Sequence, residues 1–422
     1  IPNPQSPIPN PQLTIFLIIL YNILLKINKK MSYQDSLYSF INLNPESSTD
    51  EFDFKSELVL NYSKNPLFEH LILHMKSYLK SFSTSSNEKN KVNKLTDFLN
   101  QNKFDNKILK QIIKTGIPNN LPCLRALIWK TLIGFYPIND LIKWKEITTE
   151  HFKKYLKLKK FYKDFPKNLK EEEDIKTLTQ IDKDLPRTRS DIPFFQEKSK
   201  FNKDETNYDI MRRILFFFAK RNSELGYIQG MNEIVAIIYY IFSLDENIYI
   251  KPFVESDTFF CFEILMQEIK PIFMMHNINY SQLFITMQIR QINDILKGYE
   301  PELLDYFNEK NLIMDVFLMR WLIVLFAQEF TLDSSILFWD RLLTQKNKMK
   351  FICYISVAIL VLNKKKLMKM QMEEIIQWAQ EFGTIIKNNN IDEIVETAFD
   401  IKAGIKKAPK NRGLFGFNFF FK

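Results

Sequence analysis

Apolar residues recur at helical spacing in one segment after another along this 422-residue chain. Such spacing places the apolar side chains on one face of a helix, and it predicts helices at 208–220, 231–243, 258–275, 282–296, 302–307, 316–330, 335–343 and 351–362. No alternating apolar and polar run of useful length, which would indicate a half-buried strand, accompanies them. We therefore predict an all-α architecture of many short helices packed at varied angles.

The charge of the chain is modestly positive and widely spread. The 58 Lys and Arg residues against 49 Asp and Glu residues give a net charge of +9. No zinc finger, basic zipper or other nucleic-acid motif accompanies this charge, so we expect no nucleic-acid partner. A lysine cluster with interleaved aromatic residues at 153–163 is interpreted as a solvated helix face. Contact of this cluster with an acidic endomembrane surface is the alternative interpretation.

The cysteine and histidine residues indicate neither a disulfide framework nor a metal site. The three cysteines are far apart and form no C-x-x-C pair, which is typical of a reducing compartment, and we expect a cytoplasmic protein. They are Cys123, Cys261 and Cys353. Of the four histidines, His70 and His74 share a helix face, but Leu71 stands where a zinc-protease motif needs glutamate.

Residues 1–30 are unlike the rest of the chain. A proline-rich repeat precedes an apolar run at 13–25, which is shorter than the roughly 20 residues of a membrane-spanning helix. We interpret 1–30 as sequence upstream of a true start at Met31, with an N-terminal membrane anchor as the alternative. Residues 31–107 are predicted to form an N-terminal helical and linker region, and 404–422 a basic, aromatic tail.

A short loop between two apolar segments is the first candidate functional feature. Two of only 9 glycines bracket Tyr-Ile-Gln at 227–229. Glycine allows positive φ angles and close approach of another backbone, so we expect a specially shaped turn that presents Tyr227 and Gln229. On its own, the loop fits an ordinary helix connection equally well.

A second loop carries candidate arginines. Pro186 disfavours helical angles at Leu185, so we expect Arg187 to lie in a loop rather than inside a helix. Asp184 lies three residues earlier and could hold the Arg187 guanidinium in a fixed orientation. Arg187 could then reach into the site of a partner protein. A surface ion pair explains the same pattern, and Arg189 rivals Arg187 on position alone.

Arg125 and Trp129 lie four residues apart in an apolar segment and therefore share one helix face. We expect Trp129 to be a core anchor with the positive charge of Arg125 stacked beside it.

Taken in order, these features resemble a known family. G-I-P at 116–118, R-x-x-x-W at 125–129, I-x-x-D-x-x-R at 181–187 and Y-x-Q at 227–229 follow one another in one helical chain. This arrangement resembles the TBC domain of GTPase-activating proteins for Rab GTPases, and the resemblance covers residues 108–403. It implies an all-helical, V-shaped domain that accelerates GTP hydrolysis by a Rab protein in membrane trafficking.

The resemblance also implies roles for individual residues. Arg187 corresponds to the arginine finger and Gln229 to the glutamine that positions the attacking water. Supporting roles fall to Asp184, which would orient Arg187, to Tyr227, which would hold the glutamine loop, and to Arg125 and Trp129 within the domain. Arg189 falls outside the motif, and its replacement by alanine is expected to change the rate little.

The implied partner is a Rab-family GTPase in its GTP-bound state. The GTP and magnesium would belong to that partner, so the chain would need no cofactor or metal of its own. It would be a GTPase activator rather than a stand-alone enzyme. A catalytically silent TBC module that binds Rab or trafficking proteins as a scaffold is the alternative. A scaffold of helical repeats is a third, against which no period of 30–47 residues recurs.

Overall fold

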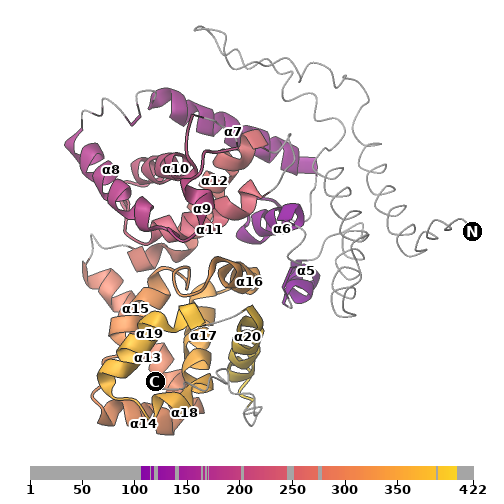
Figure 1. Ribbon diagram of the computed structural model, residues 1–422. Coiled ribbons are helices and arrows are strands. Elements are labelled where there is room, and N and C mark those ends of the chain that lie inside the picture. Colours follow the sequence, from indigo (N-terminus) through magenta and orange to yellow (C-terminus); the bar gives the residue numbers. More distant parts are fainter. Residues whose placement is uncertain are drawn as a thin grey trace, which may run out of the picture. The chain divides into compact units, whose positions relative to one another are not determined.

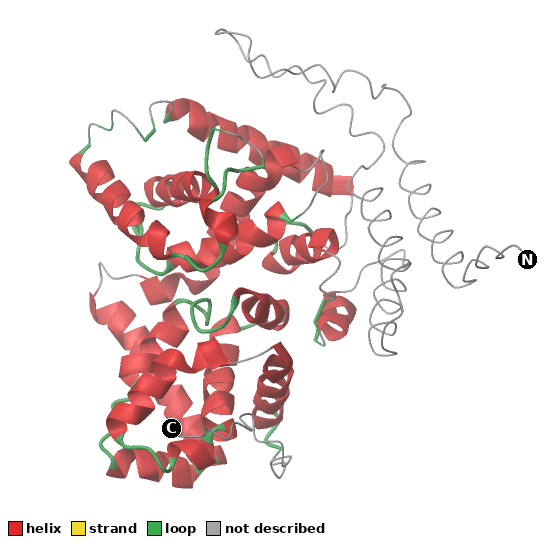
Figure 2. Ribbon diagram, in the orientation of Figure 1, coloured by secondary structure: helices red, strands yellow, loops and turns green. Residues whose placement is uncertain are grey.

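The computed structural model describes residues 106–114, 116–117, 122–137, 142–162, 165–166, 169, 171–200, 204–244, 251–273, 278–385 and 388–405. Within these ranges the chain is helical and contains no strand, apart from a single bridge between Lys198 and Thr206 (Figure 2). The predicted all-α class is confirmed. The predicted leader at 1–30, the predicted linker up to residue 105 and the tail beyond residue 405 lie outside the described residues.

The described helices follow one another with short connections (Figure 1). They are α5 (Asn106–Ile113), α6 (Pro122–Ile133), α7 (Ile142–Phe161), α8 (Glu172–Asp184), η2 (Leu185–Arg187), α9 (Pro193–Gln196), α10 (Asn207–Arg221), α11 (Met231–Ser243), η3 (Lys251–Phe253), α12 (Val254–Phe273), α13 (Ile278–Tyr299), α14 (Pro301–Glu309), α15 (Asp315–Ile323), α16 (Leu332–Leu342), α17 (Lys348–Leu362), α18 (Lys364–Leu367), α19 (Met372–Ile385) and α20 (Asn388–Lys402).

The chain divides into two compact units. The first includes Ile117–Lys157 and Ile241–Asp257, and the second includes Leu158–Tyr240 and Thr258–Lys422. In the first unit, the buried ammonium of Lys130 lies 2.5 Å from Oδ2 of the buried Asp257. The predicted core anchor Trp129 is fully buried in this unit.

The core of the second unit is built around two largely buried helices, α10 and α17. On α10, Phe216, Phe217 and Phe218 are all buried, so this helix has no fully polar face in its second half. α17 is buried along most of its length and packs against α13 and α20 (Figure 1). A helix that is apolar on nearly all sides must be covered on all sides, and α17 therefore organises this core.

Helix ends in the second unit have identifiable causes. Thr206 begins α10 with a capping box, in which its side chain accepts from Asp209 N and the Asp209 carboxylate accepts from Thr206 N. α5 ends at Ile113, and Gly116, with a φ of 87°, donates its N–H to Ile113 O at 2.6 Å. Glycine is the usual residue at such a left-handed helix end.

The predicted helix at 316–330 is wrong in its second half. α15 ends at Ile323, and residues 324–331 form a turn before α16 begins at Leu332. We call these residues the 324–331 turn. Leu325 and Phe326 have left-handed φ angles of 49° and 59°. Helical periodicity continued through the segment because Val324, Leu325, Phe326 and Phe330 are all buried by tertiary packing.

The lysine cluster lies largely on the C-terminal half of α7. Lys153, Lys154, Lys157 and Lys160 are exposed, in agreement with a solvated helix face, and Phe161 at the end of the helix is 77% exposed. Membrane contact of this face stays a prediction. None of the described helices combines the length and apolar character needed to cross a membrane.

Candidate functional site

Arg187 is the last residue of a short helical turn rather than part of an open loop. Leu185 keeps helical angles (φ −56°, ψ −45°) despite the following proline, so that α8 continues directly into η2. Pro186 is accommodated because the first turn of a helix needs no N–H donor at that position. The extended chain resumes at Thr188, and the Arg187 side chain is exposed.

Gln229 lies in the loop between α10 and α11, as predicted, and its side chain is exposed. Gly226 and Gly230 have φ angles of 63° and 104°. A Cβ atom at Gly230 would lie 2.9 Å from Val324 Cγ1, whereas one at Gly226 would meet no atom within 4 Å. Gly226 therefore serves the backbone angle alone, and Gly230 also permits close approach of the 324–331 turn.

Neither Arg187 nor Gln229 is held by another side chain or backbone group among the described residues. In the part of the chain that the structure describes, neither side chain forms a hydrogen bond or an ion pair. Both are thus available for contacts outside the chain. A buried structural arginine or glutamine would instead have its polar atoms satisfied by neighbours.

Asp184 contacts Tyr227 and not Arg187. Tyr227 Oη donates to Asp184 Oδ2 at 2.8 Å, and Gln180 Nε2 donates to the same oxygen at 3.2 Å. The predicted pairing of Asp184 with Arg187 is therefore wrong in this structure, because the buried carboxylate faces inward. Burial, and next the hydrogen bond to Asp184, raise the pKa of the Tyr227 hydroxyl above its ordinary value. The contact joins the end of α8 to the glutamine loop.

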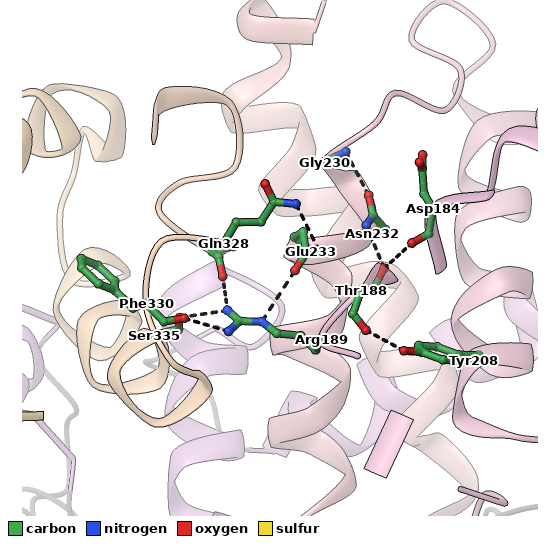
Figure 3. Close-up of polar contacts among 11 residues, drawn as sticks. Asp184, Thr188, Arg189, Tyr208, Gly230, Asn232, Glu233, Gln328, Phe330 and Ser335 are labelled. Carbon is green, nitrogen blue, oxygen red and sulfur yellow. Dashed lines mark hydrogen bonds and ion pairs between the residues drawn. The ribbon is translucent and has the colours of Figure 1, made fainter. Parts of the chain in front are cut away.

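Asn232 makes a second connection between the same segments (Figure 3). Its Nδ2 donates to Thr188 Oγ1 at 2.8 Å, and its Oδ1 accepts from Gly230 N at 2.9 Å and lies 3.2 Å from Tyr227 Oη. The Thr188 hydroxyl in turn donates to Asp184 O at 3.0 Å. Asn232 thus contacts the backbone of Gly230 and the side chain of Tyr227, on either side of Gln229, and fastens this loop to Thr188, which follows Arg187.

Arg189 is buried, whereas its position in the sequence made it a rival of Arg187 for reaching into a partner's site. Its side chain lies between α11 and the chain leading into α16 (Figure 3). Nη1 donates to Phe330 O at 2.8 Å, Nη2 donates to Ala327 O and to Ser335 Oγ, and Nε lies 3.6 Å from Glu233 Oε2. Burial lowers the pKa of the Arg189 guanidinium, against the opposing effect of Glu233.

The sequence motifs predict no role for Thr188, Asn232, Glu233 or Gln328. Gln328 Nε2 donates to Glu233 Oε1 at 3.2 Å, which completes the polar contacts around Arg189. The available signal was that Asn232 and Glu233 directly follow the glutamine motif. Their distant partners, Thr188 and Arg189, lie 44 residues earlier in the chain, and nothing in the local sequence indicates such pairings.

Arg125 and Trp129 belong to the first compact unit, and both are buried. Arg125 Nη2 donates to Ile117 O at 2.7 Å, which fastens α6 to the segment after α5. Their support of Arg187 and Gln229 stays a prediction. No group of three or more potential metal ligands occurs among the described residues, and Cys261 and Cys353 are buried free thiols.

The segments that carry these contacts match a known protein family. The family model of the Rab-GTPase-TBC domain matches residues 122–368, which is more than half of the chain. The chain belongs to the Rab-GTPase-TBC domain family. The resemblance predicted from the motifs is confirmed, and both Arg187 and Gln229 fall within the matched residues of this TBC domain.

Curated relatives support the same assignment. The chain is 27% identical to human TBC1 domain family member 13 over 373 residues, covering 68% of this chain and 92% of the relative. The sequence runs DIPFFQ at 191–196 and DTFFCF at 257–262 also indicate a resemblance to this branch of the family. The GTPase-activating protein GYP1 of Saccharomyces cerevisiae is 28% identical, over 57% of this chain and 37% of the relative.

Two solved structures share the fold of this TBC domain. The crystal structure of the Ypt/Rab-GAP domain of Gyp1p aligns with a TM-score of 0.64 and 24% identity, covering 75% of this chain and 98% of that one. A Chlamydomonas flagellar RabGAP TBC domain aligns with a TM-score of 0.52 and 17% identity, covering 80% and 93%.

Proposed function

We propose that this TBC domain accelerates GTP hydrolysis by a Rab-family GTPase in membrane trafficking, with Arg187 and Gln229 inserted into the nucleotide site of that GTPase. The observation that carries the proposal is the contrast between these side chains and their surroundings. Both are exposed and unpaired within the described residues, while the segments that bear them are joined by side-chain hydrogen bonds, one buried and one partly buried. A name among the relatives, GTPase-activating protein GYP1, supports the same function.

The chemistry needs little else from this chain. As the γ-phosphoryl group transfers, negative charge shifts on its oxygens, and an inserted guanidinium stabilises that charge. Such an arginine contributes about 10³ to 10⁵ to the rate, equivalent to roughly 4 to 7 kcal/mol at about 1.4 kcal/mol per decade. The Gln229 amide would orient the attacking water. GTP and magnesium are held by the GTPase, so no cofactor is required of this domain.

The connections between the two segments fit this role. A side chain lowers a barrier only if it reaches the reacting atoms in the right geometry without first being ordered. Tyr227 and Asn232 connect the glutamine loop to the segment that carries Arg187. The side chains of Arg187 and Gln229 would therefore enter the nucleotide site of the GTPase together. The partner would be in its GTP-bound state, because the charge that Arg187 stabilises is that of the γ-phosphoryl group.

Single-turnover GTP hydrolysis with a panel of purified Rab proteins tests the proposal. We expect the wild-type protein to accelerate at least one of them, and Arg187→Ala to lose about 10³-fold or more of that acceleration. Gln229→Ala should also lose acceleration, while the exposed Arg290→Ala on α13 serves as a control that keeps it.

The outcomes separate the proposal from its alternative. If no Rab is accelerated but some Rab is bound, the domain is a scaffold and the catalytic function is wrong. If acceleration survives both Arg187→Ala and Gln229→Ala, the domain is an activator and the residue assignment is wrong.

A further inference from the structure

Unfavourable backbone angles cluster beside the candidate site. Four non-glycine residues in the described part of the chain have positive φ, and three of them are Arg189 (47°), Leu325 (49°) and Phe326 (59°). The left-handed region is disfavoured for residues with a Cβ atom, so that the surrounding contacts must hold these angles. The three residues belong to two segments that are joined by the Arg189 side chain.

The Arg189 guanidinium uses carbonyl groups that the 324–331 turn releases from helical hydrogen bonding. It donates to Phe330 O and Ala327 O in the turn and to Ser335 Oγ in α16. An arginine can satisfy several acceptors at once because its five N–H groups are fixed in one plane. The Arg189 side chain is only 7% exposed, so it is not available to a partner protein.

The 324–331 turn lies directly against the glutamine loop. A Cβ atom at Gly230 would be 2.9 Å from Val324 Cγ1 and 3.5 Å from Ile323 Cγ2, so the turn and the end of α15 leave no room there for a side chain. Gln328 in the same turn donates to Glu233, which is also the residue that faces Arg189 Nε. Displacement of the turn would therefore move the loop that carries Gln229.

Two pairs of consecutive residues face each other at this point. Thr188 meets Asn232 at 2.8 Å, and Arg189 meets Glu233 at 3.6 Å (Figure 3). Thr188 and Arg189 directly follow Arg187 in the chain. Asn232 and Glu233 begin three residues after Gln229. Arg189 thus contacts both the turn that supports the loop and the helix that the loop enters.

We propose that Arg189 is a positioning residue, which holds the 324–331 turn against the glutamine loop and so sets the direction in which Gln229 points. The proposal rests on the proposed function above and goes beyond it, because Arg189 lies outside the motifs and touches no nucleotide. A purely structural residue would lower the amount of folded protein. A positioning residue lowers the rate constant of correctly folded protein that still binds its GTPase.

The central variant is Arg189→Lys, which keeps a positive charge near Glu233 but cannot donate to three acceptors in one plane. Arg213→Lys is the matched control, since Arg213 and Arg189 are each 8% exposed as whole residues and the fork of Arg213 binds Glu205 outside the turn. We expect Arg189→Lys to lower kcat for the activated hydrolysis by about 10- to 100-fold, as a misplaced catalytic group does. KM should stay within about twofold, and Arg213→Lys should change neither constant by more than that.

A variant that lacks Gln229 tests whether Arg189→Lys lowers kcat through this glutamine. In Gln229→Ala protein, addition of Arg189→Lys should cause no further loss beyond about twofold, because the group it positions is gone. An equal loss in both backgrounds, or a change in KM alone, would overturn the proposal. If Arg189→Lys does not fold, Ser335→Ala removes one acceptor of Arg189 and should lower kcat in the same way, and an unchanged kcat overturns the proposal.

Amide hydrogen exchange gives a readout that needs no GTPase. Gly230 N–H is held by Asn232 Oδ1, and its exchange should be faster in Arg189→Lys than in wild type or in Arg213→Lys. If wild-type protein accelerates no GTPase, the proposed function fails and the exchange measurement decides alone. Unchanged exchange at Gly230 in Arg189→Lys would then overturn the positioning role.

Discussion

The hydroxyl of Tyr227 donates to the Asp184 carboxylate at 2.8 Å, joining residues 43 positions apart in the chain. Each partner lies three residues or fewer from one of the two exposed side chains, Arg187 and Gln229. Asp184 is only 4% exposed, and Tyr227 is half-buried, so that water competes weakly for this bond. The bond makes the orientation of one segment depend on that of the other.

Replacement of Tyr227 by phenylalanine should lower both stability and activated hydrolysis. The substitution removes the hydroxyl and leaves Asp184 with the donor from Gln180, so we expect a loss of about 1 kcal/mol in the free energy of unfolding. Urea denaturation and single-turnover hydrolysis measure the two effects. Tyr306→Phe is the matched control, because the Tyr306 hydroxyl on α14 donates to Met370 O, also at 2.8 Å. We expect Tyr306→Phe to lose a similar amount of stability and to keep full activity. Equal rates of activated hydrolysis for Tyr227→Phe and Tyr306→Phe would contradict a role of the Tyr227–Asp184 bond in activity.

Gly230→Ala should be more harmful than Gly226→Ala. Both residues have positive φ, so each substitution carries the backbone penalty of about 1 kcal/mol. Only at Gly230 does the added methyl group meet Val324, at 2.9 Å, and push the loop from the 324–331 turn. We expect Gly230→Ala to lose an additional 1 kcal/mol or more of stability, on the order of an overpacked site. Equal unfolding free energies for the two variants would show that the close approach at Gly230 is unimportant.

The buried ion pair of the first compact unit should be sensitive to the loss of one partner. Lys130 and Asp257 are 4% and 1% exposed, and burial raises the pKa of Asp257 while Lys130 opposes this rise. Lys130→Met leaves the carboxylate without its counter-charge, and we expect a loss of about 3 to 5 kcal/mol in unfolding free energy. The exposed pair of Lys176 with Glu172 offers the control, where Lys176→Met should change stability by less than about 1 kcal/mol. Comparable losses of unfolding free energy in Lys130→Met and Lys176→Met would contradict a special role of the buried ion pair in stability.

Glu233 should make stability depend on pH. Burial raises its pKa above the ordinary glutamate value, with Arg189 and the Gln328 hydrogen bond lowering it and Asp191 and Asp184 raising it further. The folded state therefore binds a proton more tightly than the unfolded state. This contribution to stability is fully present below the unfolded-state pKa of about 4.3, and it is lost as the pH rises through the folded-state pKa.

Glu233→Gln removes this titration and provides the comparison. The difference in unfolding free energy, wild type minus Glu233→Gln, should fall as the pH is raised from about 5 to 8. Denaturation of both proteins over this range measures the difference. A difference that grows with pH would mean that the charged carboxylate, paired with Arg189, is the favoured form in the folded protein.

The sequence was informative where a local pattern carries the signal. Helical periodicity predicted α10, α11 and α17 closely, and the glycines around Tyr227 and Gln229 predicted the shaped loop. The same periodicity failed at 324–331, because buried apolar residues can occupy a turn as well as a helix when tertiary packing covers them. Proline at 186 likewise failed to break the helical path, since it occupies the first turn of η2.

The polar contacts of the site could not be predicted from the sequence. Asp184 was expected to hold Arg187 because the two are close in sequence, but its carboxylate is directed to Tyr227. Arg189 lies outside the motif, yet it binds carbonyl groups some 140 residues away. Such pairings depend on which segments the fold brings together, and a single sequence carries no local signal for them.

The central claim is that Arg187 and Gln229 act on the transition state of GTP hydrolysis in a partner. Binding of a responsive Rab protein loaded with GDP and aluminium fluoride tests this claim most directly, because the complex mimics the transferring phosphoryl group. A domain that stabilises the transition state binds its analogue at least about 10²-fold more tightly than the ground state. We predict that wild-type protein prefers the aluminium fluoride form over the GTP form, and that Arg187→Ala and Gln229→Ala each lose this preference. Equal affinity of the wild-type protein for both forms would contradict the claim.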